Sequence, residues 1–240
     1  MLATKSQPRP WTKRLGYNAV RYVCRMAGVA GLGLRSQDQH RLSQMDGALI
    51  CANHQSFLDP VLIGCAFQRK VNYLARESLF RFPLGPLIQM LDAIPLDRDG
   101  LGLSGLKETL RRLRRGEPVL IFPEGTRSHD GEMGPLLPGV CALARRGRAP
   151  ILPVGIAGTF DAWPRRQWLP SPTVVEVHVG EPIPHEWLVE QDDQTLLHEL
   201  DQRIRHCLES AERRRANRNL NRTQGFKGDS TRIACDNGGD

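Results

Sequence analysis

Short apolar segments alternate with amphipathic segments along most of this chain, and this pattern predicts its elements. Apolar segments of strand length occur at 47–53, 71–75, 93–96, 118–125, 150–156 and 173–180. Helices are predicted at 60–69, 82–91, 103–113 and 139–147, with a last helix from about Thr195 to Arg215. In 103–113 the leucines recur at intervals of three and four residues, which is the spacing of one helix face. The alternation predicts a single α/β domain, with a largely parallel mixed sheet flanked by helices.

The N-terminal segment, residues 1–35, is predicted to form an amphipathic helix. Its apolar residues recur at helical spacing and are Leu15, Tyr17, Val20, Val23, Ala27 and Ala30, with Lys13, Arg14, Arg21 and Arg25 between them. The uncharged run from Met26 to Leu34 is too short for a spanning helix, which needs about 20 residues. Two interpretations remain: a helix in a membrane interface with its cations toward lipid phosphates, or a helix packed on the protein's own core.

Composition indicates which kinds of partner the protein can bind and where its main domain ends. The 240 residues carry a formal net charge of +7, which suits a partner rich in phosphate, whether nucleic acid, a phosphorylated substrate or an anionic bilayer. No nucleic-acid-binding module is recognisable. The six cysteines are scattered, without metal-ligand spacing, which indicates a reducing compartment and no disulfide framework. We expect the main domain at 36–216 and a disordered polar tail at 217–240.

His54 and Asp59 follow the first predicted strand and are five residues apart. On a regular helix or strand this spacing directs the two side chains away from each other. However, Ser56 and Asp59 have the spacing of a capping box, and Pro60 suits a first helical turn. If the chain turns here, Asp59 can reach back and orient His54 as a general base. The alternative is a hydrogen-bonded loop histidine beside a plain helix cap.

A second polar segment, Phe122 to Ser128, follows a later strand and reads FPEGTRS. Gly125 allows close backbone approach, Thr126 supplies a hydroxyl, and Arg127 offers a planar fork for phosphate oxygens. Glu124 can orient Arg127 or cap the loop, and an ordinary turn with an exposed ion pair is the alternative. The sequence has no Gly-x-Ser-x-Gly motif. A base without a protein nucleophile fits direct activation of a substrate hydroxyl.

In this order the motifs resemble the glycerophospholipid acyltransferase family, which includes the 1-acylglycerol-3-phosphate O-acyltransferases. The first family block, Asn-His-x-x-x-x-Asp, matches 53–59, and the third, Phe-Pro-Glu-Gly-Thr-Arg-Ser, matches 122–128 without a substitution. A strand ending in Arg98 matches the second block, and 150–156, with Pro153, matches the fourth. The resemblance covers about residues 40 to 180. It departs at 136–139, where Leu-Leu-Pro-Gly replaces the common Phe-Lys-x-Gly, so the acceptor head group stays open.

The resemblance implies that His54, aided by Asp59, takes the proton of a glycerol hydroxyl, which attacks an acyl-thioester directly. It also implies that the acceptor's phosphate is held by Arg98, Glu124, Gly125, Thr126 and Arg127. Acyl-CoA or acyl carrier protein serves as co-substrate, without a metal or bound cofactor. We expect a peripheral or monotopic enzyme on the cytoplasmic face of an anionic membrane that converts lysophosphatidic acid to phosphatidic acid. The alternatives are acylation of another lyso-lipid, such as a lyso-ornithine lipid or lysophosphatidylglycerol, or a non-catalytic protein that binds anionic lipid.

Overall fold

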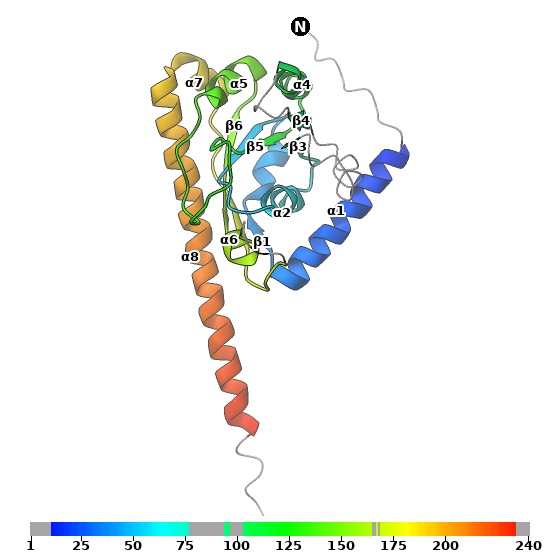
Figure 1. The fold of residues 1–240 in the computed structure, drawn as a ribbon, viewed down its shortest axis with the longest axis vertical. Coiled ribbons are helices and arrows are strands. Elements are labelled where there is room, and N and C mark those ends of the chain that lie inside the picture. Colours follow the sequence, from blue (N-terminus) through cyan, green and yellow to red (C-terminus); the bar gives the residue numbers. More distant parts are fainter. Residues whose placement is uncertain (1–10, 77–93, 97–102, 165–166, 168, 234–240) are drawn as a thin grey trace, which may run out of the picture.

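The computed structural model describes residues 11–76, 94–96, 103–164, 167 and 169–233, which form one sheet with helices on both faces (Figure 1). Seven described strands lie in the order β1-β7-β6-β2-β5-β3-β4. Their bounds are β1 Arg35–Gln37, β2 Leu49–Ala52, β3 Asn72–Arg76, β4 Ile94–Leu96, β5 Val119–Ile121, β6 Ile151–Ala157 and β7 Glu176–Val179. Every neighbouring pair is parallel except β6 and β7. The predicted fold class, a largely parallel mixed sheet, is confirmed.

Most of the predicted helices are present among the described residues, together with three short helices that the pattern did not predict. They are α1 Trp11–Leu32, the 3-10 helix η1 Gln39–Gln44, α2 Asp59–Ala66, α4 Leu103–Leu113, α5 Gly139–Gly147, α6 Thr159–Ala162, α7 His185–Glu190 and α8 Asp193–Ile233. The helix predicted at 82–91 lies outside the described residues. The predicted helices at 60–69, 103–113, 139–147 and about 195–215 correspond to α2, α4, α5 and α8. In each of them the apolar residues that gave the prediction lie on the buried side of the helix.

Two apolar cores lie on the two faces of the sheet. Successive residues of a strand point to opposite faces, so Ile50 of β2 joins one core and its neighbour Leu49 joins the other. The first core is closed by α2, including Ile63, with α1 outside it. The second core is closed by α4, α5, α7 and α8, with Leu143 and Leu200 fully packed against the strands. Because both faces are covered, the central strands read as continuous apolar runs.

The expectation of a disordered tail from Asn217 is wrong for residues 217–233. Helix α8 continues to Ile233, beyond the predicted end near Arg215 (Figure 1). Arg215 donates to the Val174 carbonyl oxygen at 2.9 Å, and Arg218 forms an ion pair with Glu176 of β7. Polar composition excludes a core in this segment, but extending an existing helix adds a hydrogen bond for each residue fixed.

The N-terminal helix α1 has two different apolar faces. Val20 and Cys24 pack against the first core, whereas Tyr22, Val23 and Met26 are exposed. The predicted single stripe is therefore divided between core and surface. The side chains of Lys13, Arg14, Leu15 and Tyr17 lie outside the described residues. No described helix is both long enough and apolar enough to cross a membrane.

Arg21 and Arg25 of α1 bind main-chain oxygens of a neighbouring helix. Arg21 donates to the carbonyl oxygens of Phe67 and Gln68, each at 2.7 Å, and Arg25 donates to that of Cys65 at 3.1 Å. These oxygens lie at the C-terminal end of α2, where cations are favourable. The expectation that these cations face lipid phosphates is corrected for Arg21, whereas Arg25 is exposed and gives only one hydrogen bond to the neighbouring helix.

Candidate active site

The site begins where β2 ends. Asn53, which is fully buried, makes two hydrogen bonds of 2.9 Å with the main chain of Ile156 on β6, one from its amide nitrogen and one to its amide oxygen. These bonds hold the end of β2 against its neighbour. The chain then turns, and α2 begins at Asp59. The turn therefore leaves the carboxyl end of a central strand, where α/β sheets place their functional residues.

His54 and Asp59 meet across this turn, as the sequence predicted. The His54 Nδ1 to Asp59 Oδ2 distance is 2.8 Å, and the Asp59 side chain is fully buried. The His54 side chain is 18% exposed, and its Nε2 atom has no hydrogen-bond partner among the described residues. One ring nitrogen is thus held by a carboxylate while the other is left to exchange a proton.

Asp59 also holds the turn in shape. Its Oδ2 atom accepts hydrogen bonds from the main-chain N–H groups of Gln55 and Ser56, each at 2.7 Å. The bond from Ser56 is the return half of the predicted capping box, while the Ser56 hydroxyl accepts from the Leu58 N–H at 3.2 Å. The same oxygen atom therefore starts α2 and orients His54.

The ring of His54 is fixed from one side by Phe122, the first residue of FPEGTRS. The two rings are stacked, with centroids 3.9 Å apart and planes 14° apart. Main-chain bonding joins the same two segments, because the Ser128 N–H donates to the His54 carbonyl oxygen at 2.8 Å. The two motifs, separated in sequence, are packed as one unit.

Glu124 connects these segments as well. Its carboxylate accepts from the His54 N–H at 2.7 Å through Oε1 and from the Gly134 N–H at 2.9 Å through Oε2. Burial raises the pKa of Glu124 above its usual value, and the two backbone hydrogen bonds act in the opposite direction. The sequence left open whether Glu124 orients Arg127 or caps the loop, and this geometry favours the cap.

The middle of FPEGTRS has the open backbone that the sequence predicted. Gly125 has a φ of +70°, a backbone conformation that other residues rarely adopt, and a Cβ atom there would lie 2.5 Å from the tip of the Leu137 side chain, which would have to move. Thr126 is exposed. Leu137, whose N–H donates to the Pro123 carbonyl oxygen at 2.8 Å, lies against Gly125, at the position where the family resemblance leads us to expect lysine.

Arg127 lies over an aromatic ring of the first motif. Its guanidinium carbon is 3.4 Å from the centroid of the Phe57 ring, which is the geometry of a cation–π contact. The Phe57 ring is tilted by 55° against that of Trp163, with centroids 6.0 Å apart. Arg98 lies outside the described residues, so its assignment to the site stays a prediction.

Sequence reasoning missed Phe57, Phe122 and Trp163. Phe57 and Phe122 lie inside the two motifs. An aromatic residue close in sequence to His54 or Arg127 was a signal that could have identified them. Trp163 had no such signal. It reaches the site because its carbonyl oxygen accepts from the Ser56 hydroxyl at 2.8 Å, a contact between residues 107 positions apart.

Comparison with known proteins assigns the family. The family model described as acyltransferase matches residues 33–157, more than half of the chain. The chain belongs to the acyltransferase family. It is 29% identical over 143 residues to the 1-acyl-sn-glycerol-3-phosphate acyltransferase of Bacillus subtilis, covering 59% of this chain and 69% of that protein. It is 32% identical over 169 residues to the human beta enzyme of the same name, covering 68% and 60%.

A solved structure supports the same fold for this acyltransferase. The crystal structure of the 1-acyl-sn-glycerophosphate (LPA) acyltransferase PlsC from Thermotoga maritima superposes with a TM-score of 0.74 and 22% identity, over 86% of this chain and 84% of that one. The aligned region spans 52% of the Pseudomonas aeruginosa relative, which is 34% identical and covers 55% of this chain. Several curated relatives are thus matched over less than two thirds of their length. Family and fold are confirmed.

Proposed function

We propose that this protein is an O-acyltransferase that moves a fatty acyl group from an acyl-thioester to the free hydroxyl of 1-acylglycerol-3-phosphate, giving phosphatidic acid. The observation that carries the proposal is the pairing of His54 Nδ1 with the buried carboxylate of Asp59 at 2.8 Å. A histidine held in this way is a general base, and its Nε2 atom is the position for the substrate proton.

The reaction proceeds in one transfer without a covalent enzyme intermediate. Nε2 of His54 takes the proton of the acceptor hydroxyl while its oxygen attacks the thioester carbonyl carbon. Asp59 stabilises the imidazolium that forms. The tetrahedral intermediate then collapses, the carbon–sulfur bond breaks, and the imidazolium returns the proton to the leaving thiolate. The ester product and a free thiol result, and the base is restored.

The acceptor's phosphate is assigned to the FPEGTRS loop. Arg127 supplies a guanidinium fork, and Gly125 and Thr126 supply backbone and hydroxyl groups on the exposed side of the loop. Arg98 is part of the proposed phosphate site by resemblance alone. Glu124 contributes indirectly, by holding the loop against His54.

The donor is acyl-CoA or acyl carrier protein, and the proposal requires neither a metal nor a bound cofactor. A lysophospholipid acceptor places the enzyme at a bilayer, and the exposed apolar residues of α1 suit that position. We therefore propose a peripheral or monotopic enzyme on the cytoplasmic face of an anionic membrane. No nucleic-acid partner is part of the proposal.

The deciding experiment follows acyl transfer from a labelled acyl-thioester to a panel of lyso-lipids. The panel contains lysophosphatidic acid, lysophosphatidylglycerol and a lyso-ornithine lipid, because the family lysine is replaced by Leu137. His54→Ala is expected to abolish transfer, whereas His198→Ala, at an exposed histidine of α8, is expected to retain it. Transfer that His54→Ala leaves undiminished would contradict the assignment. Preference for another acceptor would correct the substrate, and lipid binding without any transfer would support the non-catalytic alternative.

A further inference from the structure

A second site lies at the far end of α2 from His54. A surface pocket of about 250 Å³ opens between α1, the edge strand β1 and the last turn of α2. Its polar lining is Arg25, Arg35, Ser36 and Gln39, and Val29 contributes to its apolar side. Ligand pockets for whole drug-sized molecules usually measure about 300–1,000 Å³, so this pocket suits part of a ligand.

The pocket is positively charged and its cations have donors to spare. Arg25 gives one hydrogen bond, to the Cys65 carbonyl oxygen, and a guanidinium has five N–H donors. The Arg35 side chain has no hydrogen-bond or ion-pair partner among the described residues. No carboxylate lines the pocket, and the nearby Asp38 lies 3.6 Å from the guanidinium of Arg41. Two guanidinium groups without an acid select an anion, and their planar forks match phosphate oxygens.

The surface beside the pocket is apolar. Val29 lines the pocket and is also exposed on α1, together with Tyr22, Val23 and Met26, which are 65%, 65% and 49% exposed. These four residues form one exposed stripe along the helix, because Tyr22, Met26 and Val29 are spaced at four and three positions and Val23 lies three positions before Met26. A ligand that fills the pocket and continues along this surface has an anionic end and an apolar end.

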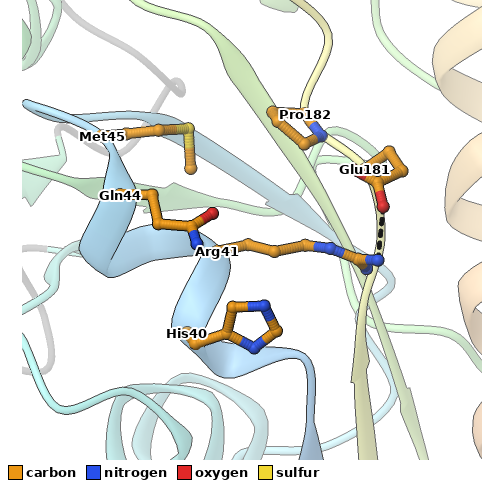
Figure 2. A pocket seen from close by; sticks show the side chains of 6 residues that line it. All are labelled: His40, Arg41, Gln44, Met45, Glu181 and Pro182. Carbon is orange, nitrogen blue, oxygen red and sulfur yellow. Dashed lines mark hydrogen bonds and ion pairs between the residues drawn. The ribbon is translucent and has the colours of Figure 1, made fainter.

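A larger pocket at η1 lacks this character. It measures about 390 Å³ and is lined by Arg41, Glu181 and their neighbours (Figure 2). In Figure 2 the guanidinium of Arg41 is already paired with the Glu181 carboxylate, and Arg41 also donates to the Val179 carbonyl oxygen. Its charge is therefore compensated within the protein. The pocket at the end of α2 is the better anion site.

We infer that the pocket lined by Arg25 and Arg35 binds the phosphate-bearing head group of an anionic phospholipid, in the bilayer that the exposed stripe of α1 contacts. This lipid is a membrane ligand separate from the acceptor, because the pocket lies at the opposite end of α2 from the base. The inference extends the proposed membrane location, and it does not require that acyl transfer take place.

The test measures how the full chain partitions onto vesicles of phosphatidylcholine alone and of phosphatidylcholine with phosphatidylglycerol. Arg35→Gln is expected to weaken binding to the anionic vesicles about fivefold, the effect of one arginine near such a surface, and to leave the weak neutral binding unchanged. Arg35→Lys keeps the charge but not the fork, and we expect it to lose most of the same preference. Arg146→Lys, at an exposed arginine of α5 on the other face of the sheet, is the control and is expected to bind as wild type. Melting temperatures verify that each variant is folded.

Three outcomes overturn the inference. Wild-type binding by Arg35→Lys would show that charge near the surface suffices, without a head-group site. An equal loss in the α5 control, which also keeps its charge, would show that replacing an exposed arginine by lysine weakens binding wherever it lies, without a head-group site. Release of the protein from anionic vesicles by inorganic phosphate, at the concentration of the lipid phosphate, would assign the pocket to a free anion.

Two further variants distinguish head-group binding in the pocket from apolar membrane contact and from acyl transfer. Val23→Ser, in the exposed stripe, is expected to weaken binding to both vesicle types, because it removes apolar contact rather than head-group recognition. His54→Ala is expected to keep wild-type preference for anionic vesicles. If acyl transfer is never detected but Arg35→Lys loses the anionic preference, the proposed function fails and the lipid site stands. If acyl transfer is detected but Arg35→Lys keeps the anionic preference, the proposed function stands and the lipid site is refuted.

Discussion

The substitution Glu124→Gln tests what the most buried acid of the FPEGTRS loop does. The resemblance placed Glu124 at the acceptor's phosphate, whereas both of its oxygen atoms accept main-chain hydrogen bonds, from His54 and Gly134. Glutamine keeps one acceptor oxygen and brings an N–H₂ group to the other backbone donor. One N–H group is then left facing another donor in a buried place.

The expected magnitude follows from these two bonds. A hydrogen bond to a charged group contributes about 1.5–3 kcal/mol, and an unsatisfied buried donor costs about 1–3 kcal/mol. Part of this loss is offset because burial disfavours the carboxylate, as the raised pKa of Glu124 shows. We therefore expect Glu124→Gln to lower the free energy of unfolding by about 2 kcal/mol. For a chain of this size that is a fall of about 4–8 °C in Tm.

Activity distinguishes the two roles of Glu124. If it positions the main chain of His54, Glu124→Gln lowers kcat by about 10–100-fold, because small displacements of a base have large effects, and leaves the acceptor KM nearly unchanged. Calorimetry and steady-state kinetics measure both quantities. Glu132→Gln, an exposed acid of the same loop, is the control and is expected to change neither. A raised acceptor KM with unchanged kcat and Tm would refute the loop-holding role and return Glu124 to the phosphate.

Three further predictions concern neighbouring contacts. Asp59→Asn is expected to lower kcat by about 10²–10⁴-fold with little change in the donor KM, and near wild-type turnover would remove Asp59 from the orienting role. Phe57→Ala removes the ring beneath Arg127, a contact of about 0.5–1 kcal/mol, so the acceptor KM should rise roughly two- to fivefold, and Phe57→Tyr should restore it; a change confined to the donor KM would contradict this. Hydrogen bonding to Arg111 lowers the pKa of Glu108 from 4.5 to about 2, so its carboxylate stabilises the fold above pH 4.5 and loses this effect as the pH falls toward 2. Glu108→Gln should thus reduce stability by about 1 kcal/mol at neutral pH and less as the pH falls, as urea unfolding can measure, and a constant difference would refute the sign.

Much of the fold and the central pair of the site could be predicted because the signals are local. The alternation of apolar segments predicted strands β2 to β7 but not the polar edge strand β1, and the capping-box spacing of Ser56 and Asp59 located the start of α2. That start predicted a turn between the strand and the helix, across which Asp59 could reach back to His54. The 2.8 Å contact confirms this inference.

What could not be predicted depends on contacts between distant segments. Amphipathic spacing could not show that Arg21 and Arg25 bind the end of α2, because the neighbouring helix is 40 to 47 residues away. Polar composition predicted disorder after Asn217, but the ion pair of Arg218 with β7 was not visible in the sequence. Likewise, Trp163 enters the site through its main chain, which carries no sequence signal.

The turn at 53–59 and the FPEGTRS segment are packed together, and this packing bears on the proposed recognition of the acceptor. Both oxygens of Glu124 are engaged by main-chain donors, and Leu137 lies where the family resemblance leads us to expect a cation. Among the described residues assigned to the phosphate, the positive charge is therefore that of Arg127. Phe57 holds that charge and lies three residues after His54, within the same turn. Because one short turn positions both the proposed base and the proposed phosphate anchor, a shift of the turn displaces them together. Substitutions of Phe57 and Glu124 should consequently be non-additive, because residues that share a packed unit couple through it.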